Sequence, residues 1–85
     1  MKEYRYTVRD ELGMHARPAA GFVKTARKFP CKITVAKHDK EADAKQIFAV
    51  MELELCRGEE MILRAEGSQE EEAIAALGGF LEKNL

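Results

Sequence analysis

No stretch of the sequence approaches the roughly 18 consecutive apolar residues that a membrane-spanning helix needs, and the opening segment lacks the apolar core of a signal peptide. Neither sign of charge dominates, because 14 Lys and Arg stand against 15 Asp and Glu, for a net charge of −1. Such a chain has no overall basic field to attract nucleic acid or an anionic membrane. These absences predict a cytoplasmic protein with no membrane insertion and no nucleic-acid partner.

Metal-ligand patterns are missing as well. The two cysteines, Cys31 and Cys56, form no CxxC pair and have no histidine nearby at ligand spacing, which argues against a zinc site. In a reducing cytosol we expect both to be free thiols buried in the core. We expect no metal and no other cofactor.

The length limits the architecture. A chain of 85 residues is near the lower end of what folds without disulfides or metals, so we predict a single domain, 1–85, with one core. The balance of 46% hydrophobic and 34% charged residues is typical of a globular protein rather than a disordered one. We expect a monomer.

Alternation of apolar and polar residues predicts four strands. In segment 3–8, Tyr4, Tyr6 and Val8 fall on one side and polar residues on the other, which indicates a strand with one solvent-exposed face. Similar reasoning, with polar turns between segments, predicts strands over 31–36, about 42–44 and 61–66.

Helical spacing of apolar residues predicts three helices. The first spans 16–29 and ends at Pro30, because a buried face recurs at Ala19, Phe22, Val23 and Ala26. The second is the short segment 45–53, which is so dense in apolar residues that the pattern does not separate a helix from a strand. The third begins with a capping box from Ser68 to Glu71 and buries Ile74, Leu77 and Leu81.

The resulting order is βαββαβα. One-faced strands favour a four-stranded, mostly antiparallel sheet, with the three helices on one face. The predicted fold class is therefore α+β, in the form of an open-faced β-sandwich.

The segment LGMHARPA, residues 12–19, is the one place where the pattern suggests chemistry. Pro18 suits the first turn of a helix, where a missing N–H is harmless, so the helix begins near Ala16 with His15 at the cap. Free N–H groups there, including that of Ala16, would bind a phosphoryl group on His15, and Arg17 could pair with it. Nucleophile, N–H groups and cation together are what reversible phosphorylation of histidine requires.

Spacing alone leaves another interpretation open, in which His15 is an exposed cap residue and Arg17 a solvated charge. The second histidine, His38, lies in a charged turn and is interpreted as an ordinary surface residue.

The motif LGMHARPA, followed by KQIFAVMEL and the final SQEEEAIAAL helix, resembles the histidine-containing phosphocarrier protein (HPr) family of the bacterial phosphoenolpyruvate:sugar phosphotransferase system. The resemblance covers essentially the whole chain. It implies the βαββαβα sandwich, phosphorylation of His15 on Nδ1 by enzyme I, and donation of the group to EIIA domains of sugar transporters. It also implies that Arg17 stabilises the phosphate.

Two positions depart from the family pattern. Gln46 stands where many members carry a regulatory serine, and an amide offers a kinase no hydroxyl, so that switch should be missing. Leu12 stands where members often carry Asn or Ser, so support for the loop should come from backbone groups. The sequence leaves open whether the protein serves a sugar branch or a nitrogen-related branch.

A docking surface is predicted beside His15, because a helix as short and apolar as 45–53 cannot bury all its side chains. It consists of an apolar patch of Ala20, Ile47, Phe48 and Met51 with a basic rim of Lys24, Arg27 and Lys45. The alternative is that Ile47 and Met51 belong to the core. Partners should be acidic around their own active sites.

Two rival functions are a nucleic-acid-binding sandwich and a regulatory paralogue that has lost phosphoryl transfer. The first needs stacking aromatics on the open sheet face, whereas Tyr4 and Tyr6 should point to the core. The presence of His15 argues against the second.

Overall fold

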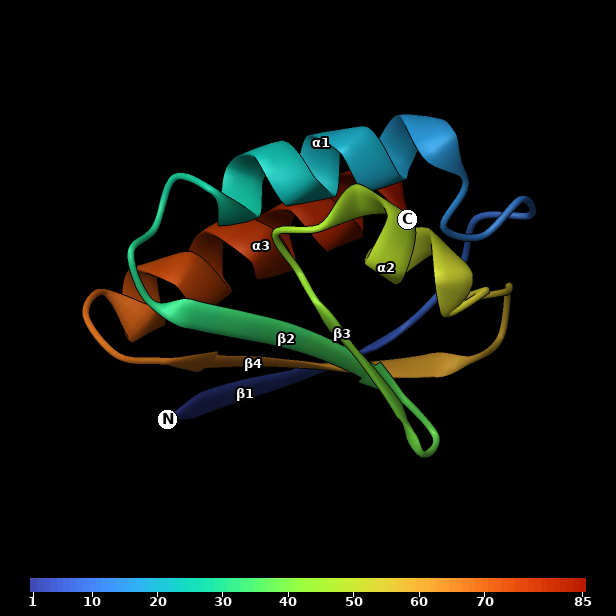
Figure 1. The fold of residues 1–85 in the computed structure, drawn as a ribbon. Coiled ribbons are helices and arrows are strands. Elements are labelled where there is room, and N and C mark those ends of the chain that lie inside the picture. Colours follow the sequence, from blue (N-terminus) through green and yellow to red (C-terminus); the bar gives the residue numbers. More distant parts are fainter.

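The computed structural model describes residues 1–85 and has four strands and three helices (Figure 1). Their order and bounds are β1 (Lys2–Thr7), α1 (Ala16–Ala26), β2 (Lys32–Lys37), β3 (Lys40–Asp43), α2 (Ile47–Glu52), β4 (Glu60–Glu66) and α3 (Glu70–Asn84). The predicted order βαββαβα is confirmed. None of the helices has the length and apolar composition needed to cross a bilayer.

The four strands form one sheet in the order β1-β4-β2-β3, and every neighbouring pair is antiparallel. Of the two inner strands, β4 pairs Met61 with Tyr6 of β1 on one side and Leu63 with Val35 of β2 on the other. All three helices cover the same face of the sheet, and the opposite face is open (Figure 1). The predicted open-faced sandwich is therefore confirmed.

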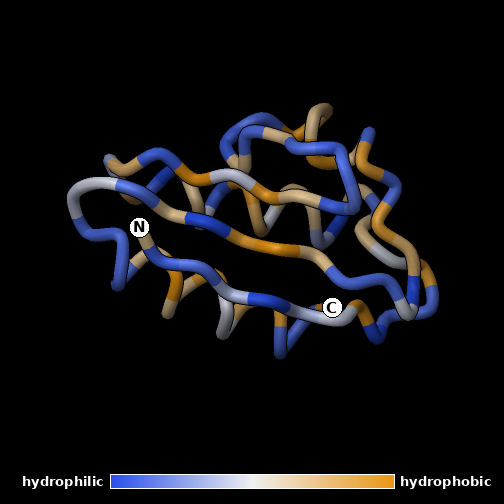
Figure 2. The backbone as a smooth tube through the Cα atoms, turned by 90° about the horizontal axis from the view of Figure 1, so that it is seen from below, coloured by the Kyte–Doolittle hydropathy of each residue, from blue (hydrophilic) through white to orange (hydrophobic).

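The core lies between this sheet and the helices, and it follows the period-two pattern of the strands. Met61, Leu63 and Ala65 are fully buried, whereas Ile62 and Arg64 between them are half-buried. Seen from the open side of the sheet, β1 is hydrophilic along its length, whereas the middle of β4 beside it is hydrophobic (Figure 2). A shift of one residue in register would turn the apolar side chains to solvent, so the pattern fixes the register.

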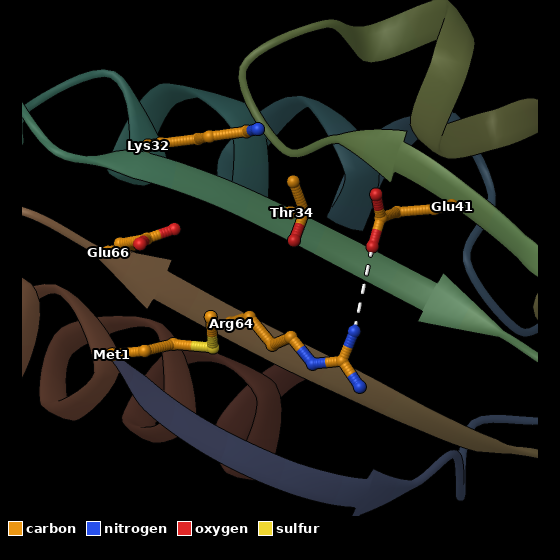
Figure 3. Close-up of a pocket in the computed structure, with 6 residues that line it drawn as sticks. All are labelled: Met1, Lys32, Thr34, Glu41, Arg64 and Glu66. Carbon is orange, nitrogen blue, oxygen red and sulfur yellow. Dashed lines mark ion pairs between the residues drawn. The ribbon is translucent and has the colours of Figure 1, made fainter.

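Ion pairs cover part of the open face. Arg64 on β4 contacts Glu3 of β1 at 2.8 Å, in a hydrogen bond that lowers the pKa of Glu3, and Glu41 of β3 at 3.7 Å. The latter pair spans a shallow depression on this face (Figure 3). Exposed pairs of this kind add little stability. No aromatic side chain lies on this face, because Tyr6 is buried and the ring of Tyr4 lies against Gly78 of α3.

The helix ends differ from the predicted ones. Helix α1 ends at Ala26, and the N–H groups of Lys28 and Phe29 donate to carbonyls three residues back instead of four. Helix α2 begins only at Ile47, because Asp43 forms a turn in which its carboxylate accepts the N–H of Lys45 at 2.9 Å. Side-chain and main-chain groups outside the helical pattern thus decide both ends.

The predicted capping box of Ser68 and Glu71 is wrong. Gln69 is the cap residue of α3, with a left-handed φ of 63°, and makes no side-chain cap hydrogen bond. Instead the carboxylate of Glu70 accepts the N–H of Gly67 at 3.0 Å. The tight turn over 67–69 therefore moves the start of the helix past Ser68.

The buried faces of the helices agree largely with the prediction. The four residues predicted for the first helix are buried, as are Leu77 and Leu81 of α3, but Ile74 is only half-buried. Both cysteines are free thiols, yet only Cys31 is buried, and Cys56 is exposed in the turn before β4.

Two phenylalanines offer a matched test of this core. Phe22 of α1 is fully buried, whereas Phe48 of α2 is 77% exposed. Phe22→Ala should lower the free energy of unfolding by about 3–5 kcal/mol, because it leaves a cavity between helix and sheet. Phe48→Ala should change it by only about 0.5 kcal/mol. Urea unfolding of both variants measures the difference, and similar losses would contradict the burial of Phe22 in the core.

Candidate functional site

His15 occupies the cap position of α1, as predicted. Its backbone is extended, with φ −85° and ψ −178°, and its carbonyl oxygen accepts the N–H of Ala19 at 3.0 Å. The imidazole makes no cap hydrogen bond and is half-buried. No cap hydrogen bond therefore occupies either ring nitrogen, and the ring is open to a reaction partner.

The first turn of α1 presents unpaired donors next to this ring. The N–H groups of Ala16 and Arg17 have no hydrogen-bond partner within the protein, and Pro18 has no N–H to offer. The first turn also contains no acidic residue that would compete for these donors. Unpaired N–H groups at the positive end of a helix dipole bind anions well.

Arg17 is exposed and forms no ion pair and no side-chain hydrogen bond. Its guanidinium group is therefore free to take a second anion ligand through two parallel hydrogen bonds. Both His15 and Arg17 line an open depression of about 420 Å³ between the start of α1 and the last turns of α3. Its other lining residues are Asp10, Pro18, Gly21, Phe80 and Asn84.

Sequence reasoning did not find Asp10, Phe80 or Asn84. Phe80 and Asn84 lie on the last helix, far from His15 along the chain, and no local pattern links them to it. A signal did exist for Asp10, because Asp often accepts an N–H two residues ahead in a turn.

The loop that carries His15 rests on the turn between α2 and β4. Gly13 has a left-handed φ of 65°, and a side chain there would collide with the carbonyl oxygen of Leu55. The N–H of Met14 donates to that same oxygen at 2.8 Å. Glycine is needed here both for its φ and for this close approach.

Asp10 supplies the rest of the support. Its carboxylate accepts the N–H of Leu12 at 2.8 Å, and its carbonyl accepts the N–H of Gly13 at 3.0 Å. The prediction that only backbone groups would support the loop is therefore wrong, because a side chain two residues before Leu12 does so. Leu12 itself is 74% exposed.

The end of the chain fixes the start of this loop. The main-chain oxygen of Leu85 accepts the N–H groups of both Arg9 and Asp10 at 2.7 Å. The Arg9 guanidinium donates to the hydroxyl of Tyr6 at 3.0 Å and to the carbonyl of Glu82 at 2.7 Å. The loop is thus tied to β1 and α3 before it reaches His15.

The turn between α2 and β4, on which Gly13 packs, is stabilised by the carboxylate of Glu59. The carboxylate of Glu59 accepts hydrogen bonds from the Lys37 ammonium at 2.9 Å and from the Cys56 N–H at 2.8 Å. These hydrogen bonds, that from Lys37 first, lower the pKa of Glu59 to about 2. His38 is exposed, 3.6 Å from Glu59, and lies in none of the groups around His15.

The structure brings most of the predicted docking residues together. A shallow groove between α1 and α2 is lined by Ala20, Val23, Lys24, Arg27 and Ile47. Phe48 is exposed on α2, whereas Ile47 and Met51 are half-buried and pack against the core. Ile47 and Met51 therefore belong partly to the core and partly to the surface, so each of the two predicted alternatives is half right.

Lys45 lies differently from the predicted rim. Its ammonium group donates to the carbonyls of Phe29 and Cys31 at 2.7 and 2.8 Å, and its own carbonyl accepts a hydrogen bond from Arg27. Lys45 therefore ties α2 to the end of α1. Gln46 is exposed and caps α2 without a side-chain hydrogen bond.

Comparison with known proteins agrees on one family. The family model described as "PTS HPr component phosphorylation site" matches residues 2–83. Phosphocarrier protein HPr of Vibrio cholerae is 39% identical over 83 residues, which cover 98% of each chain. HPr-like protein Crh of Halalkalibacterium halodurans is 40% identical over 83 residues, which cover 98% of this chain and 99% of the relative.

Solved structures give the same result. The crystal structure of HPr-C-His from Thermoanaerobacter tengcongensis has a TM-score of 0.93 at 46% identity, over 98% of this chain and 93% of that one. A crystal structure of an HPr dimer from the same organism has a TM-score of 0.78 at 46% identity, over 98% and 95% of the two chains.

Glycine substitutions test how the loop is supported. Gly13 and Gly58 both have positive φ, but open space surrounds Gly58. Gly58→Ala should cost about 1–2 kcal/mol of unfolding free energy from backbone strain alone. Gly13→Ala should cost about 1–3 kcal/mol more, because the Leu55 carbonyl must move. It should also speed hydrogen exchange at the Met14 N–H. Equal costs, with Met14 equally protected in both variants, would disprove the contact.

Proposed function

Because the chain belongs to the HPr family of phosphocarrier proteins of the phosphotransferase system, we propose that it accepts a phosphoryl group from enzyme I on Nδ1 of His15 and donates it to EIIA domains of sugar transporters. The observation that supports this most strongly is the free imidazole of His15 beside two unpaired N–H groups at the start of α1. This arrangement is what a transient phosphohistidine needs.

Transfer requires a ring nitrogen with a free electron pair. In the neutral imidazole with its proton on Nε2, the Nδ1 pair attacks the phosphorus of the donor. The new N–P bond forms as the bond from phosphorus to the donor breaks, and the donor keeps that electron pair. The reverse sequence passes the group to the acceptor and restores the neutral ring.

The phosphoryl oxygens would then meet groups already in place. The N–H groups of Ala16 and Arg17 donate to them without any reorganisation of the helix, and the Arg17 side chain closes over them from solvent. Because the depression is open, the group remains accessible to the next protein.

We propose that partners dock on the groove between α1 and α2. Its apolar lining of Ala20 and Ile47, with the exposed ring of Phe48 and part of Met51 nearby, would form a small central contact. Lys24 and Arg27 add positive charge at the groove, and Lys45 supports it from behind. A small interface steered by charge suits a carrier that must release each partner quickly.

The finer assignment rests on two residues. His15 favours a working carrier over a paralogue that has lost transfer, although the chain is about equally similar to HPr and to Crh. Gln46 offers no hydroxyl, so we propose that no serine kinase acts at this position. We further propose that the protein works as a cytoplasmic, single-domain monomer, and size measurement in solution tests this against the dimer seen for a relative.

The central test compares the two histidines. His15→Ala should abolish uptake of label from radioactive phosphoenolpyruvate in the presence of enzyme I, because the nucleophile is gone. Its stability should fall by no more than about 0.5–2 kcal/mol, the range for a cap residue. His38→Ala, the matched control, should be labelled like the wild type. The label should be acid-labile and base-stable, and any label on His15→Ala would place the site elsewhere.

Docking is tested with apolar residues on opposite faces. Phe48→Ala should raise the Michaelis constant for the protein as a substrate of enzyme I by about five- to thirtyfold with little change in kcat, since it removes about 1–2 kcal/mol of interface contact. Ile62→Ala, on the open face of the sheet, should leave the constant unchanged. If Ile62→Ala has the larger effect, partners bind the sheet face instead.

A further inference from the structure

Asp10 shares the depression with His15 and Arg17, and its carboxylate carries a negative charge there. If His15 is phosphorylated as proposed, this carboxylate lies in the same open depression that must receive a negatively charged phosphoryl group.

The position of this carboxylate is fixed by its surroundings. The Asp10 N–H donates to the Leu85 oxygen, its carbonyl accepts from Gly13, and one carboxylate oxygen accepts from Leu12. Asp10 is half-buried. These hydrogen bonds restrain both the main chain and the carboxylate of Asp10. The carboxylate therefore cannot move far away when a phosphoryl group enters the depression.

No cation neutralises it. Asp10 takes part in no ion pair of the structure, and Arg17 forms none either. The depression therefore contains one free carboxylate and one free guanidinium. A phosphoryl group on His15 attracts the Arg17 guanidinium and repels the Asp10 carboxylate.

We propose that Asp10 sets the phosphoryl-transfer potential of His15. Its carboxylate raises the free energy of the phosphorylated protein relative to the unphosphorylated one, so the group passes to an acceptor more readily. The chemistry of transfer is unchanged, because Asp10 neither forms nor breaks a bond. Arg17 acts in the opposite direction and stabilises the phosphorylated form.

The charge of Asp10 can be separated from its support of the loop. In Asp10→Asn, the amide oxygen can still accept the N–H of Leu12, so the turn is kept while the charge is lost. Glu11→Gln is the matched control, since it removes the same charge from the next residue. The Glu11 side chain is 86% exposed, lies 3.8 Å from Arg57, and does not line the depression.

The experiment mixes phosphorylated enzyme I with stoichiometric protein and measures the equilibrium distribution of label between the two. Asp10→Asn should shift the equilibrium constant about three- to tenfold toward the phosphorylated carrier at low salt. The shift should shrink below about twofold near 1 M salt, because the carboxylate is only half-buried and its field is screened. Glu11→Gln should stay within about twofold of wild type, and Arg17→Ala should shift the constant the other way.

The outcomes are distinguishable. Equal constants for Asp10→Asn, Glu11→Gln and wild type overturn the inference while leaving His15 as the carrier site. A shift in Asp10→Ala but not in Asp10→Asn also overturns it, because only the loop would then matter. A wild type that takes no label from enzyme I overturns the proposed function itself, and the inference with it.

Discussion

The Leu55 carbonyl oxygen accepts the N–H of Met14, and it occupies the place that a side chain on Gly13 would need. This contact joins the loop before α1 to the turn that follows α2, two segments about forty residues apart in the chain. It fixes the start of α1 relative to α2, and so fixes His15, the proposed nucleophile, relative to the groove where partners would dock. A looser contact would leave His15 free to move with respect to a bound partner, and transfer depends on alignment within a fraction of an ångström.

Most of the fold could be predicted because its burial pattern is local. Alternation in β4 and the apolar face of α1 each specify which side meets the core, and a sheet covered on one face satisfies all of them at once. The ends of elements were less predictable. Ser68 and Glu71 have the spacing of a capping box, but the turn after β4 is decided by Gly67 and Gln69 in left-handed conformations. The conformation of this turn depends on the position and direction of the chain at the end of β4, and local propensities carry no information about either.

The candidate site divides in the same way. His15, Ala16 and Arg17 are neighbours in sequence, so one helix start places all three and the motif suffices to find them. The remaining walls come from α3, and only the packing of α3 against α1 brings Phe80 and Asn84 to them. Lys45 shows the opposite case: its charge near a surface helix predicts a contact with a partner, whereas the carbonyls of Phe29 and Cys31 after α1 bind its ammonium group. Main-chain groups that must be satisfied take precedence over a role in recognition.

A carrier differs from an enzyme in what its site must stabilise. Deep burial and many donors around His15 would hold the phosphoryl group so tightly that the acceptor could not remove it. The structure has instead two unpaired N–H groups, one free guanidinium and one free carboxylate around an open depression. Each contribution is small because solvent screens it, and two of them oppose each other. The free energy of a phosphoryl group on His15 can therefore be raised or lowered by changing a single charge that lines the depression. Such a change leaves intact the contact between Met14 and Leu55, on which the geometry of the loop depends.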